Sequence, residues 1–209
     1  MLMNLFEIVN IGFKISGVIH IGAHHGQEVD VYRSLNINSI LFEPHPDSFN
    51  ILINKFENAS DVILENIALG SKTETKIMYC ETANQAMSCS LLKPKKHLSY
   101  YPHIKFESEK TVNQIALDDY IKTKNVDLNN YNFINMDVQG YELEVLKGSV
   151  NTLKNIDHIM TEINFEDLYE NCVKADELDK FLNNFGFKRI YTAPTQFGWG
   201  DAFYSKVQI

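Results

Sequence analysis

The sequence FINMDVQGYELEVLKG, residues 133–148, decides the fold class of this chain. Its first residues, among them Phe133, Ile134 and Met136, form an apolar run that is typical of a strand buried inside a parallel sheet. Leu143 and Leu146 then recur at helical spacing. A strand joined to an amphipathic helix through an acidic, glycine-containing turn is the repeating unit of α/β proteins.

The polar residues of this stretch lie at the turn itself. Asp137, Gln139 and Glu142 follow the strand, so the sequence places them at its carboxyl end. Ligands of open α/β sheets bind just outside the carboxyl ends of the parallel strands. We therefore expect this turn to belong to a functional site.

Strands and helices alternate along most of the chain. Further strands are predicted at residues 17–22, 39–43, 61–70 and 156–163, a short extra strand at 75–81, and two paired closing strands at 187–191 and 201–205. Helices are predicted after the first two strands, from residue 117, after the turn at 137–140, and over 175–185. This order predicts an α/β fold with a mainly parallel sheet and helices on both faces.

Length and composition favour one domain over residues 1–209. Hydrophobic residues make up 44% and charged residues 22%, which are globular proportions. We expect residues 1–16 to be an N-terminal extension. Residues 82–110 show little regular pattern, and an irregular segment of this length in a compact domain is usually functional or mobile, so we expect a loop on the substrate side.

The net charge of -8 argues against nucleic acid as a partner, because affinity for phosphate backbones comes largely from Lys and Arg. A local cluster, Lys93, Lys95 and Lys96, is the exception. It is either a solvated loop or a patch for an anionic sugar or a nucleotide.

Cysteine usage and hydropathy point to a soluble, cytoplasmic protein. Cys80, Cys89 and Cys172 are an odd number without a pairing pattern, which favours free thiols in a reducing compartment. The start of the chain has no basic segment with a cleavage site, and no apolar run reaches about 18 residues. We expect no membrane insertion.

A glycine-bracketed turn after the first strand suggests an adenosine-containing ligand. Gly22 and Gly26 allow a ligand close to the backbone, and Glu43 at the end of the second strand can accept hydrogen bonds from ribose hydroxyls. The dinucleotide pattern G-x-G-x-x-G is missing, since residues 23–25 between the glycines are Ala, His and His. A ligand without phosphates fits better, and S-adenosylmethionine is the common cofactor of that kind.

With these motifs the chain resembles FkbM-type S-adenosylmethionine-dependent methyltransferases. The resemblance covers about residues 17 to 205 and rests on five motifs in order: VIHIGAHHG at 18–26, FEPHP at 42–46, NIALG at 66–70, LDDY at 117–120 and DVQGYELEVLKG at 137–148.

The resemblance implies a Rossmann-like, seven-stranded methyltransferase sheet with an antiparallel last strand, and methyl transfer to a hydroxyl oxygen. By matching position it implies that Gly22, Ala23 and Gly26 line the methionine part of the cofactor, that Glu43 lines the ribose, and that Asn66 and Ala68 line the adenine. The complete predicted cofactor set is His20, Gly22, Ala23, His24, Gly26, Glu43, Pro44, Asn66, Ala68 and Asp137.

Three positions depart from the family's pattern. Family members usually have an acid where His20 stands, Asn where His24 stands, and Lys where Asn135 stands. The first two departures imply a different mode of binding for the cofactor's amino and carboxylate groups. The third removes a lysine that would assist deprotonation of the acceptor.

Asp137 is the first candidate for a general base, followed by Glu162 and His45. The alternative for Asp137 is a cofactor contact or a hydrogen bond that holds the turn. A divalent metal held by these groups with His24 and His25 is possible but not expected, because no His or Cys spacing typical of a metal site supports it.

Residues that contact the acceptor are expected in the irregular segments, namely Ser88, Ser90, Tyr100, Tyr101 and Trp199. Each aromatic residue among them could equally pack beneath its loop. The sequence as a whole predicts an O-methyltransferase that acts on a hydroxyl of a sugar in a glycan or glycosylated metabolite. The alternatives are a non-catalytic module that binds a cofactor or a glycan, and a nicotinamide-dependent dehydrogenase.

Overall fold

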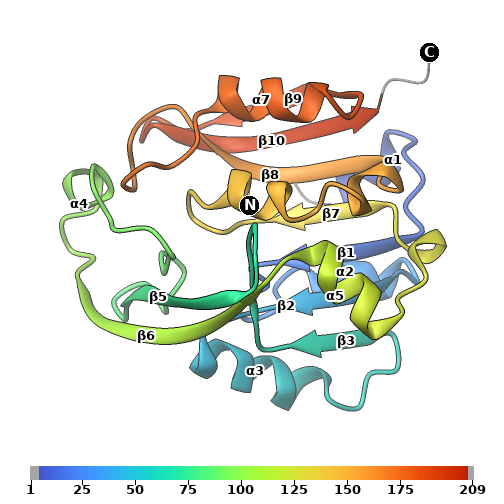
Figure 1. Cartoon of the computed structure of the whole chain (residues 1–209), viewed down its shortest axis with the longest axis horizontal. Helices are drawn as coiled ribbons and strands as arrows, with labels where there is room; N and C mark the ends of the chain where they lie inside the picture. The colour runs from blue at the N-terminus through green and yellow to red at the C-terminus, as the bar shows by residue number, and fades with distance from the viewer. Residues whose placement is uncertain (1–4, 207–209) are drawn as a thin grey trace.

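The computed structural model describes residues 5–206 and contains a seven-stranded sheet in the order β3-β2-β1-β7-β8-β10-β9. These strands are β1 (Gly17–Ile21), β2 (Asn38–Phe42), β3 (Val62–Glu65), β7 (Phe133–Met136), β8 (His158–Asn164), β9 (Phe187–Pro194) and β10 (Trp199–Lys206). β10 runs antiparallel to both β8 and β9, and the other neighbours are parallel. The predicted fold class is confirmed (Figure 1).

Helices cover both faces of this sheet. They are α1 (Leu5–Asn10), α2 (Val29–Ser34), α3 (Pro46–Phe56), α5 (Leu117–Lys124), α6 (Glu142–Lys147) and α7 (Ala175–Asn183), with short 3-10 turns at Leu128–Asn130 and Thr152–Lys154. The short helix α4 (His97–Tyr100) lies apart from both faces, beyond the strand ends (Figure 1). Because side chains alternate along a strand, Ile19 packs into the core beneath α5, α6 and α7, while its neighbour Val18 packs against α1, α2 and α3.

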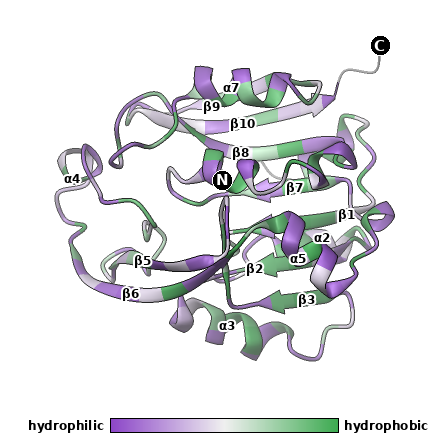
Figure 2. Cartoon of the chain, in the orientation of Figure 1, coloured by the Kyte–Doolittle hydropathy of each residue, from purple (hydrophilic) through white to green (hydrophobic). Residues whose placement is uncertain are grey.

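The apolar residues that build this core lie mainly on the central strands. Figure 2 shows β1 and β3 largely hydrophobic, whereas β6 is hydrophilic along much of its length. In α7, Leu178 and Leu182 are fully buried, so one face of an otherwise polar helix holds it to the sheet.

A second, three-stranded sheet in the order β4-β6-β5 consists of β4 (Ala68–Leu69), β5 (Glu74–Glu81) and β6 (Phe106–Ile115). The predicted strand at 61–70 is therefore two strands in two sheets. The irregular segment is also shorter than predicted, since it ends at residue 105. The sequence of β6, FESEKTVNQI, hides its strand character because most of its side chains are exposed or half-exposed.

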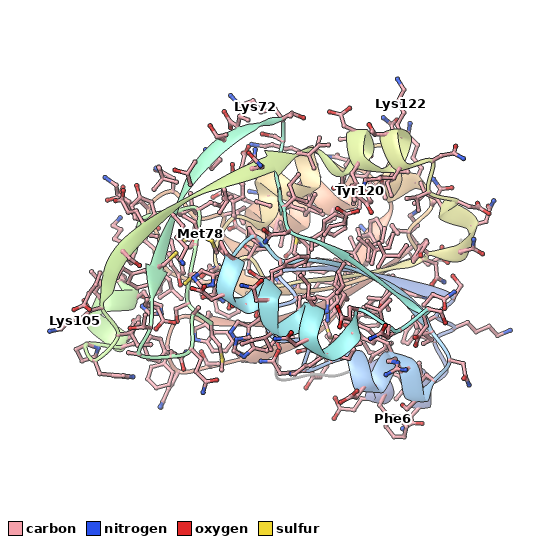
Figure 3. All side chains as sticks on the ribbon, turned by 90° about the horizontal axis from the view of Figure 1, so that it is seen from below. Phe6, Lys72, Met78, Lys105, Tyr120 and Lys122 are labelled. Atoms are coloured by element: carbon pink, nitrogen blue, oxygen red, sulfur yellow. The ribbon has the colours of Figure 1, made fainter. Side chains whose placement is uncertain are left out.

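The ribbon formed by β5 and β6 extends along one side of the main sheet, from near Lys72 at one end to Lys105 at the other (Figure 3). It places residues 82–105 above the carboxyl ends of the central strands. No helix within residues 5–206 is long and apolar enough to cross a bilayer.

The expected N-terminal extension includes α1, which packs on the sheet through the buried Leu5 and Ile8. Residues 1–4 of that extension, and 207–209 at the end of the expected single domain, lie outside the described residues.

Candidate active site

The site is built where β1, β2 and β7 end side by side. Gly22 follows β1, Glu43 follows β2, and Asp137 follows β7. A Cβ atom on Gly22 would lie 1.9 Å from the Asp137 carbonyl oxygen, and Gly22 has a φ of +81°. Only glycine allows the chain after β1 to pass this close to the chain after β7.

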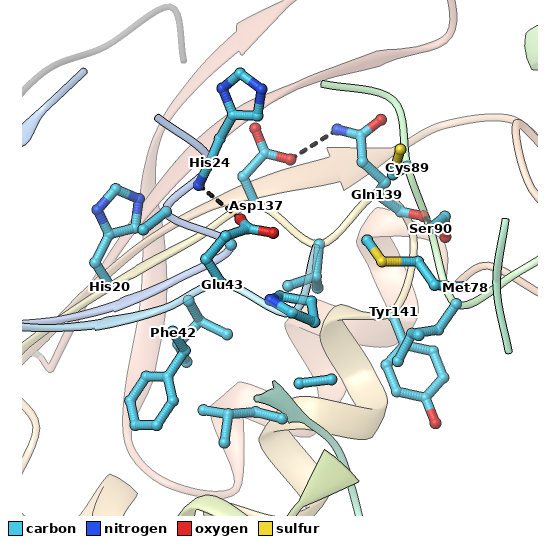
Figure 4. Close-up of a pocket in the computed structure, with 18 of the residues that line it drawn as sticks. His20, His24, Phe42, Glu43, Met78, Cys89, Ser90, Asp137, Gln139 and Tyr141 are labelled. Carbon is cyan, nitrogen blue, oxygen red and sulfur yellow. Dashed lines mark hydrogen bonds between the residues drawn. The ribbon is translucent and has the colours of Figure 1, made fainter. Parts of the chain in front are cut away.

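A first cavity of about 350 Å³ opens at these strand ends (Figure 4). It is lined by eight of the ten residues predicted to bind the cofactor: His20, Gly22, Ala23, His24, Glu43, Pro44, Ala68 and Asp137. The wall also includes Phe42, Met78, Met87, Leu91, Val138 and Tyr141, which were not predicted. It is an apolar chamber with a few carboxylates and backbone groups, as is usual for sites of small organic ligands.

The other two predicted residues, Gly26 and Asn66, support the wall from outside it. Gly26 is buried, and a Cβ atom there would meet Leu52 and Phe56 of α3. The Asn66 amide donates hydrogen bonds to the carbonyl oxygens of Glu43 and Pro44, at 2.8 and 3.3 Å. Asn66 therefore fixes the turn that carries Glu43.

Glu43 is the best-positioned polar group of the first cavity. Its two carboxylate oxygens accept hydrogen bonds from the backbone N–H groups of His24 and His45, each at 2.7 Å. Burial raises its pKa to about 7, although these hydrogen bonds act in the opposite direction. The side chain is thus fixed in place, while its remaining lone pairs can accept hydrogen bonds from a ligand.

His24 connects the first turn to the segment that covers the site. Its Nε2 lies 2.6 Å from the Gln85 carbonyl oxygen, and its Nδ1 lies 2.9 Å from the Gln27 side-chain amide. The ring stacks on that of His25. An imidazole with its proton on Nε2 satisfies both contacts, so His24 fastens residues 82–90 over the first cavity.

A second cavity of about 450 Å³ adjoins the first. Asp137 and Gln139 line both cavities and form their boundary. Four further predicted residues line the second cavity, namely Glu162, Ser88, Tyr101 and Trp199, together with the unpredicted Asn84, Met87, His97, His103, Ile104 and Leu168. Two chambers that meet at a carboxylate can hold a donor and an acceptor on opposite sides of it.

Three residues predicted to bind the acceptor or to act as a base do not line the second cavity. Ser90 lines the first cavity, and its hydroxyl donates to the Gln139 carbonyl oxygen at 2.8 Å. Tyr100 lines neither cavity and donates its hydroxyl to Glu166 at 2.9 Å. His45, proposed as a base, lines a separate third cavity.

The carboxylate of Asp137, at the boundary between the two cavities, is held by the side-chain amide of Gln139. Gln139 Nε2 donates to Asp137 Oδ1 at 2.7 Å and to Glu162 Oε2 at 3.1 Å, while the Tyr169 hydroxyl donates to Gln139 Oε1 at 2.8 Å. Gln139 has a φ of +54°. The sequence placed Gln139 in the turn expected to belong to a functional site but gave it no specific role there.

Burial affects both carboxyl groups beside Gln139. It raises the pKa of Asp137, and it raises that of Glu162 well above the ordinary range, with the nearby charges of Asp137 and Glu142 acting in the same direction. Asp137 is half-buried and Glu162 is 4% exposed. Burial therefore favours the neutral form of Glu162, which can donate a hydrogen bond.

Glu142 supports the turn from below. Its Oε1 accepts hydrogen bonds from the backbone N–H groups of Val138 and Gly140, at 3.3 and 3.1 Å, and the side chain is fully buried. Burial raises its pKa to about 7. A carboxylate at the start of α6 thus fixes the backbone that presents Asp137 and Gln139.

Neither cavity has a lysine or arginine among the described residues that line it. Two lysines of the cluster pair with acids instead: Lys95 contacts Asp167 at 2.9 Å and Lys96 contacts Glu166 at 2.8 Å. These pairs join the segment around α4 to the chain after β8. Because these lysines are paired outside the cavities, the charged residues among those that line the cavities are acids.

The sequence pattern of the family described as "Methyltransferase FkbM domain" matches residues 20–189. The chain is 37% identical over 84 residues to the 2-O-methyltransferase NoeI of Sinorhizobium fredii, a match that covers 40% of this chain and 34% of NoeI. It is 25% identical over 130 residues to the hexuronic acid methyltransferase AglP of Haloferax volcanii, which covers 62% of this chain and 48% of AglP. The matches thus span between a third and a half of these relatives.

Solved structures show the same fold. The FkbM methyltransferase of Methylobacillus flagellatus KT superposes with a TM-score of 0.57 at 14% identity, covering 90% of this chain and 43% of that one. Magnesium protoporphyrin IX methyltransferase (ChlM) of Synechocystis PCC 6803, solved with bound SAM, gives 0.52 at 9% identity, covering 97% and 75%. Together with the family match, the five motifs establish that this chain belongs to the FkbM methyltransferase family.

Proposed function

We propose that this protein is an S-adenosylmethionine-dependent O-methyltransferase that acts on a hydroxyl group of a sugar. The observation that carries the proposal is the boundary between the two cavities, where Asp137 faces both. Support for a sugar acceptor comes from the relatives named 2-O-methyltransferase and hexuronic acid methyltransferase.

The first cavity fits S-adenosylmethionine better than a dinucleotide. Its charged lining residues are acids, among them Glu28, Glu43 and Asp137, and no lysine or arginine lines it to meet a pyrophosphate. A cofactor with a positively charged sulfur complements this lining. Glu43 would accept hydrogen bonds from the ribose hydroxyls, and the apolar wall around Met78 and Leu91 would enclose the base.

S-adenosylmethionine would supply an activated methyl group. The protein then has two tasks, which are to hold the acceptor oxygen in line with that group and to remove the hydroxyl proton. Positioning of this kind can supply up to about 7–11 kcal/mol of the barrier reduction. Gln139 orients Asp137 for the second task, because its amide holds Oδ1 and leaves Oδ2 for the acceptor hydroxyl.

Asp137 is the proposed base, and Glu162 a hydrogen-bond donor. In the transfer, the acceptor oxygen would gain the methyl group as the sulfur–carbon bond of the donor breaks, and Asp137 would accept the hydroxyl proton. Glu162, whose neutral form is favoured by burial, would donate to a second oxygen of the sugar. His45 lies in the third cavity and takes no part in this scheme.

The acceptor is proposed to be a neutral sugar. The second cavity has Tyr101 and Trp199 for contact with a sugar ring, and Asp137 lines it without a lysine or arginine among the described lining residues. A carboxylate on the acceptor would lie near the Asp137 carboxylate without a lysine or arginine to pair with. The name of AglP suggests a hexuronic acid as the alternative, which the acidic lining disfavours.

Calorimetry with S-adenosylmethionine, S-adenosylhomocysteine and NAD tests the cofactor. Binding of both sulfur ligands and no binding of NAD is expected, and the reverse result would sink the proposal in favour of a dehydrogenase. Mass spectrometry of a panel of neutral hexosides and matched hexuronates after incubation with S-adenosylmethionine then tests the acceptor. Binding without any methylated product across the panel would instead support a non-catalytic module.

A further inference from the structure

Three side chains that the proposed reaction does not use come together at the edge of the first cavity, whose wall includes one of them, Cys89. His45 precedes α3, Cys80 lies in β5, and Cys89 lies in the segment that returns beside β5. One ligand atom from each lies within 4.8 Å of the other two, and all three residues are buried. Nitrogen and sulfur donors from three separate parts of the chain thus face a common point.

Backbone pairing brings the two cysteines together. Tyr79 and Ser90 form an antiparallel bridge, with reciprocal N–H···O bonds of 2.8 and 3.1 Å. Cys80 and Cys89 form the next pair along the two chains, on the side of the connecting loop. They occupy a non-hydrogen-bonded position, where opposite side chains lie close together. The proximity of their sulfur atoms is therefore fixed by the backbone rather than by mobile side chains.

We propose that His45, Cys80 and Cys89 form a structural binding site for Zn²⁺. Two thiolates and one imidazole are ligands that zinc prefers, and its usual geometry is tetrahedral. Zinc–sulfur bonds of about 2.3 Å would place the two sulfur atoms about 3.8 Å apart. Atoms already within 4.8 Å of one another need to move by only about 1 Å to reach this geometry.

The surroundings provide what such a site needs. The Glu81 backbone N–H donates to Cys89 Sγ at 3.4 Å, a bond that stabilises a thiolate. Ser48 contacts His45 Nδ1 through its N–H and its hydroxyl, at 3.4 and 3.3 Å, and so fixes the orientation of the ring. The third cavity, of about 280 Å³, borders His45 and Cys80 and has room for a fourth ligand such as water.

Charge and protons balance at this site. The Cys80 thiol now donates to the Met78 carbonyl oxygen at 3.4 Å. Coordination of both sulfur atoms as thiolates releases their protons to solvent, and one Zn²⁺ with two thiolates carries no net charge. A neutral cluster suits a position this deeply buried.

Zinc at this site would fix the segment that covers the active site. The chain between Cys80 and Cys89 carries Met87, which lines both cavities, and Ser88, which lines the second. The turn before His45 carries Glu43. A metal that joins these parts would hold the cofactor side of the site without touching the reacting atoms.

Zinc titration of the full chain tests the proposal. The protein is reduced, treated with a chelator and titrated with Zn²⁺ against a chromophoric competitor, with metal analysis after dialysis. One zinc per chain and a higher melting temperature are expected. Peptide mapping after alkylation of the folded protein should show that zinc slows the modification of Cys80 and Cys89 but leaves that of Cys172 unchanged.

Matched variants complete the test. Cys89→Ser should weaken zinc binding by at least the roughly 10–100-fold that loss of an outer partner costs. Cys172→Ser, which removes a buried cysteine outside the cluster, should retain one zinc. Absence of zinc binding by the folded, reduced wild type, or equal loss in both variants, overturns the proposal. So does a Cys80–Cys89 disulfide in a protein that binds no zinc after reduction. The alkylation experiment uses the wild type and decides the matter even if Cys89→Ser does not fold.

Discussion

His20 and Asn135 lie directly opposite each other on the parallel strands β1 and β7, with Asn135 Nδ2 3.5 Å from His20 Nε2. Asn135 also donates to the Tyr32 hydroxyl at 2.6 Å, and that hydroxyl lies 3.2 Å from His20 Nδ1. Burial lowers the pKa of His20, so the three side chains form a neutral network beneath the site. Two positions at which the sequence suggested a departure from the family's pattern are thus in contact with each other.

This pairing predicts strong coupling between the two positions. His20→Asp alone leaves a buried carboxylate without a cation, and Asn135→Lys alone leaves a buried ammonium without an anion. Each should cost about 3–5 kcal/mol of unfolding free energy, as removal of one partner from a buried pair does. The double variant should lose less than the sum, with a coupling of about 1–3 kcal/mol by urea denaturation. Strictly additive losses would show that the two side chains act independently.

Asp137 and Glu162 should differ in their effect on turnover. Asp137→Asn removes the proposed base and should lower kcat by roughly 10²–10⁴-fold. Glu162→Gln replaces a carboxyl group whose neutral form is favoured by burial and should lower kcat less than about tenfold. Rates from single-turnover product formation provide the measurement. Circular dichroism should be unchanged in both variants, and equal losses would remove Asp137 from its role as base.

Cofactor affinity should rise with pH and level off above about 7, where Glu43 is ionised. Donation from ribose hydroxyls favours the carboxylate, so binding releases a proton while the pKa of free Glu43 exceeds the pH. Below that value the affinity falls by up to about tenfold per pH unit. Calorimetry in buffers of different ionisation enthalpy measures the release directly. Glu43→Gln should bind more weakly with little pH dependence, and a flat wild-type profile would contradict the prediction.

Glu142 should reduce stability as the pH rises. Its folded pKa of about 7 lies above the ordinary value of 4.5. The folded state therefore binds more protons between these values, and the stability present at low pH is lost as the pH rises through 7. Glu142→Gln keeps an acceptor for Val138 and Gly140 but carries no charge. The unfolding free energy of the variant relative to wild type should increase by about 1–3 kcal/mol from pH 5 to pH 8. Parallel profiles of the two proteins would exclude this effect.

Trp199 should contribute to acceptor binding. It lines the second cavity, and its Nε1 donates to the Tyr101 hydroxyl at 3.0 Å, which fixes the position of the ring. Trp199→Leu should raise KM for the acceptor about tenfold, equivalent to about 1.4 kcal/mol, with the cofactor's Kd unchanged. Tyr100→Phe is the control, because Tyr100 lies nearby but lines neither cavity. A similar KM in both variants would place the acceptor elsewhere.

Local sequence was sufficient for much of the fold. The apolar run from Phe133 with the helical spacing of Leu143 and Leu146 predicted β7 and α6, and similar patterns predicted the other parallel strands. Local sequence did not predict β6, because a strand with few buried side chains lacks the alternation of apolar and polar residues that identifies a strand. The strand-end rule also placed Gly22, Glu43 and Asp137 together, since parallel strands end on one edge.

The sequence by itself determined the alternation of strands and helices and the polar residues at the strand ends, because both depend on periodicity and spacing along a short stretch of chain. Only the tertiary structure decided which residues face the second cavity, that His20 meets Asn135 at a separation of 115 residues, and that His45 lies with Cys80 and Cys89. These contacts depend on how distant segments pack, and packing leaves no local periodic signal. The separation of Asp137 from His45, the first and last of the three bases that the sequence suggested, was decided in the same way.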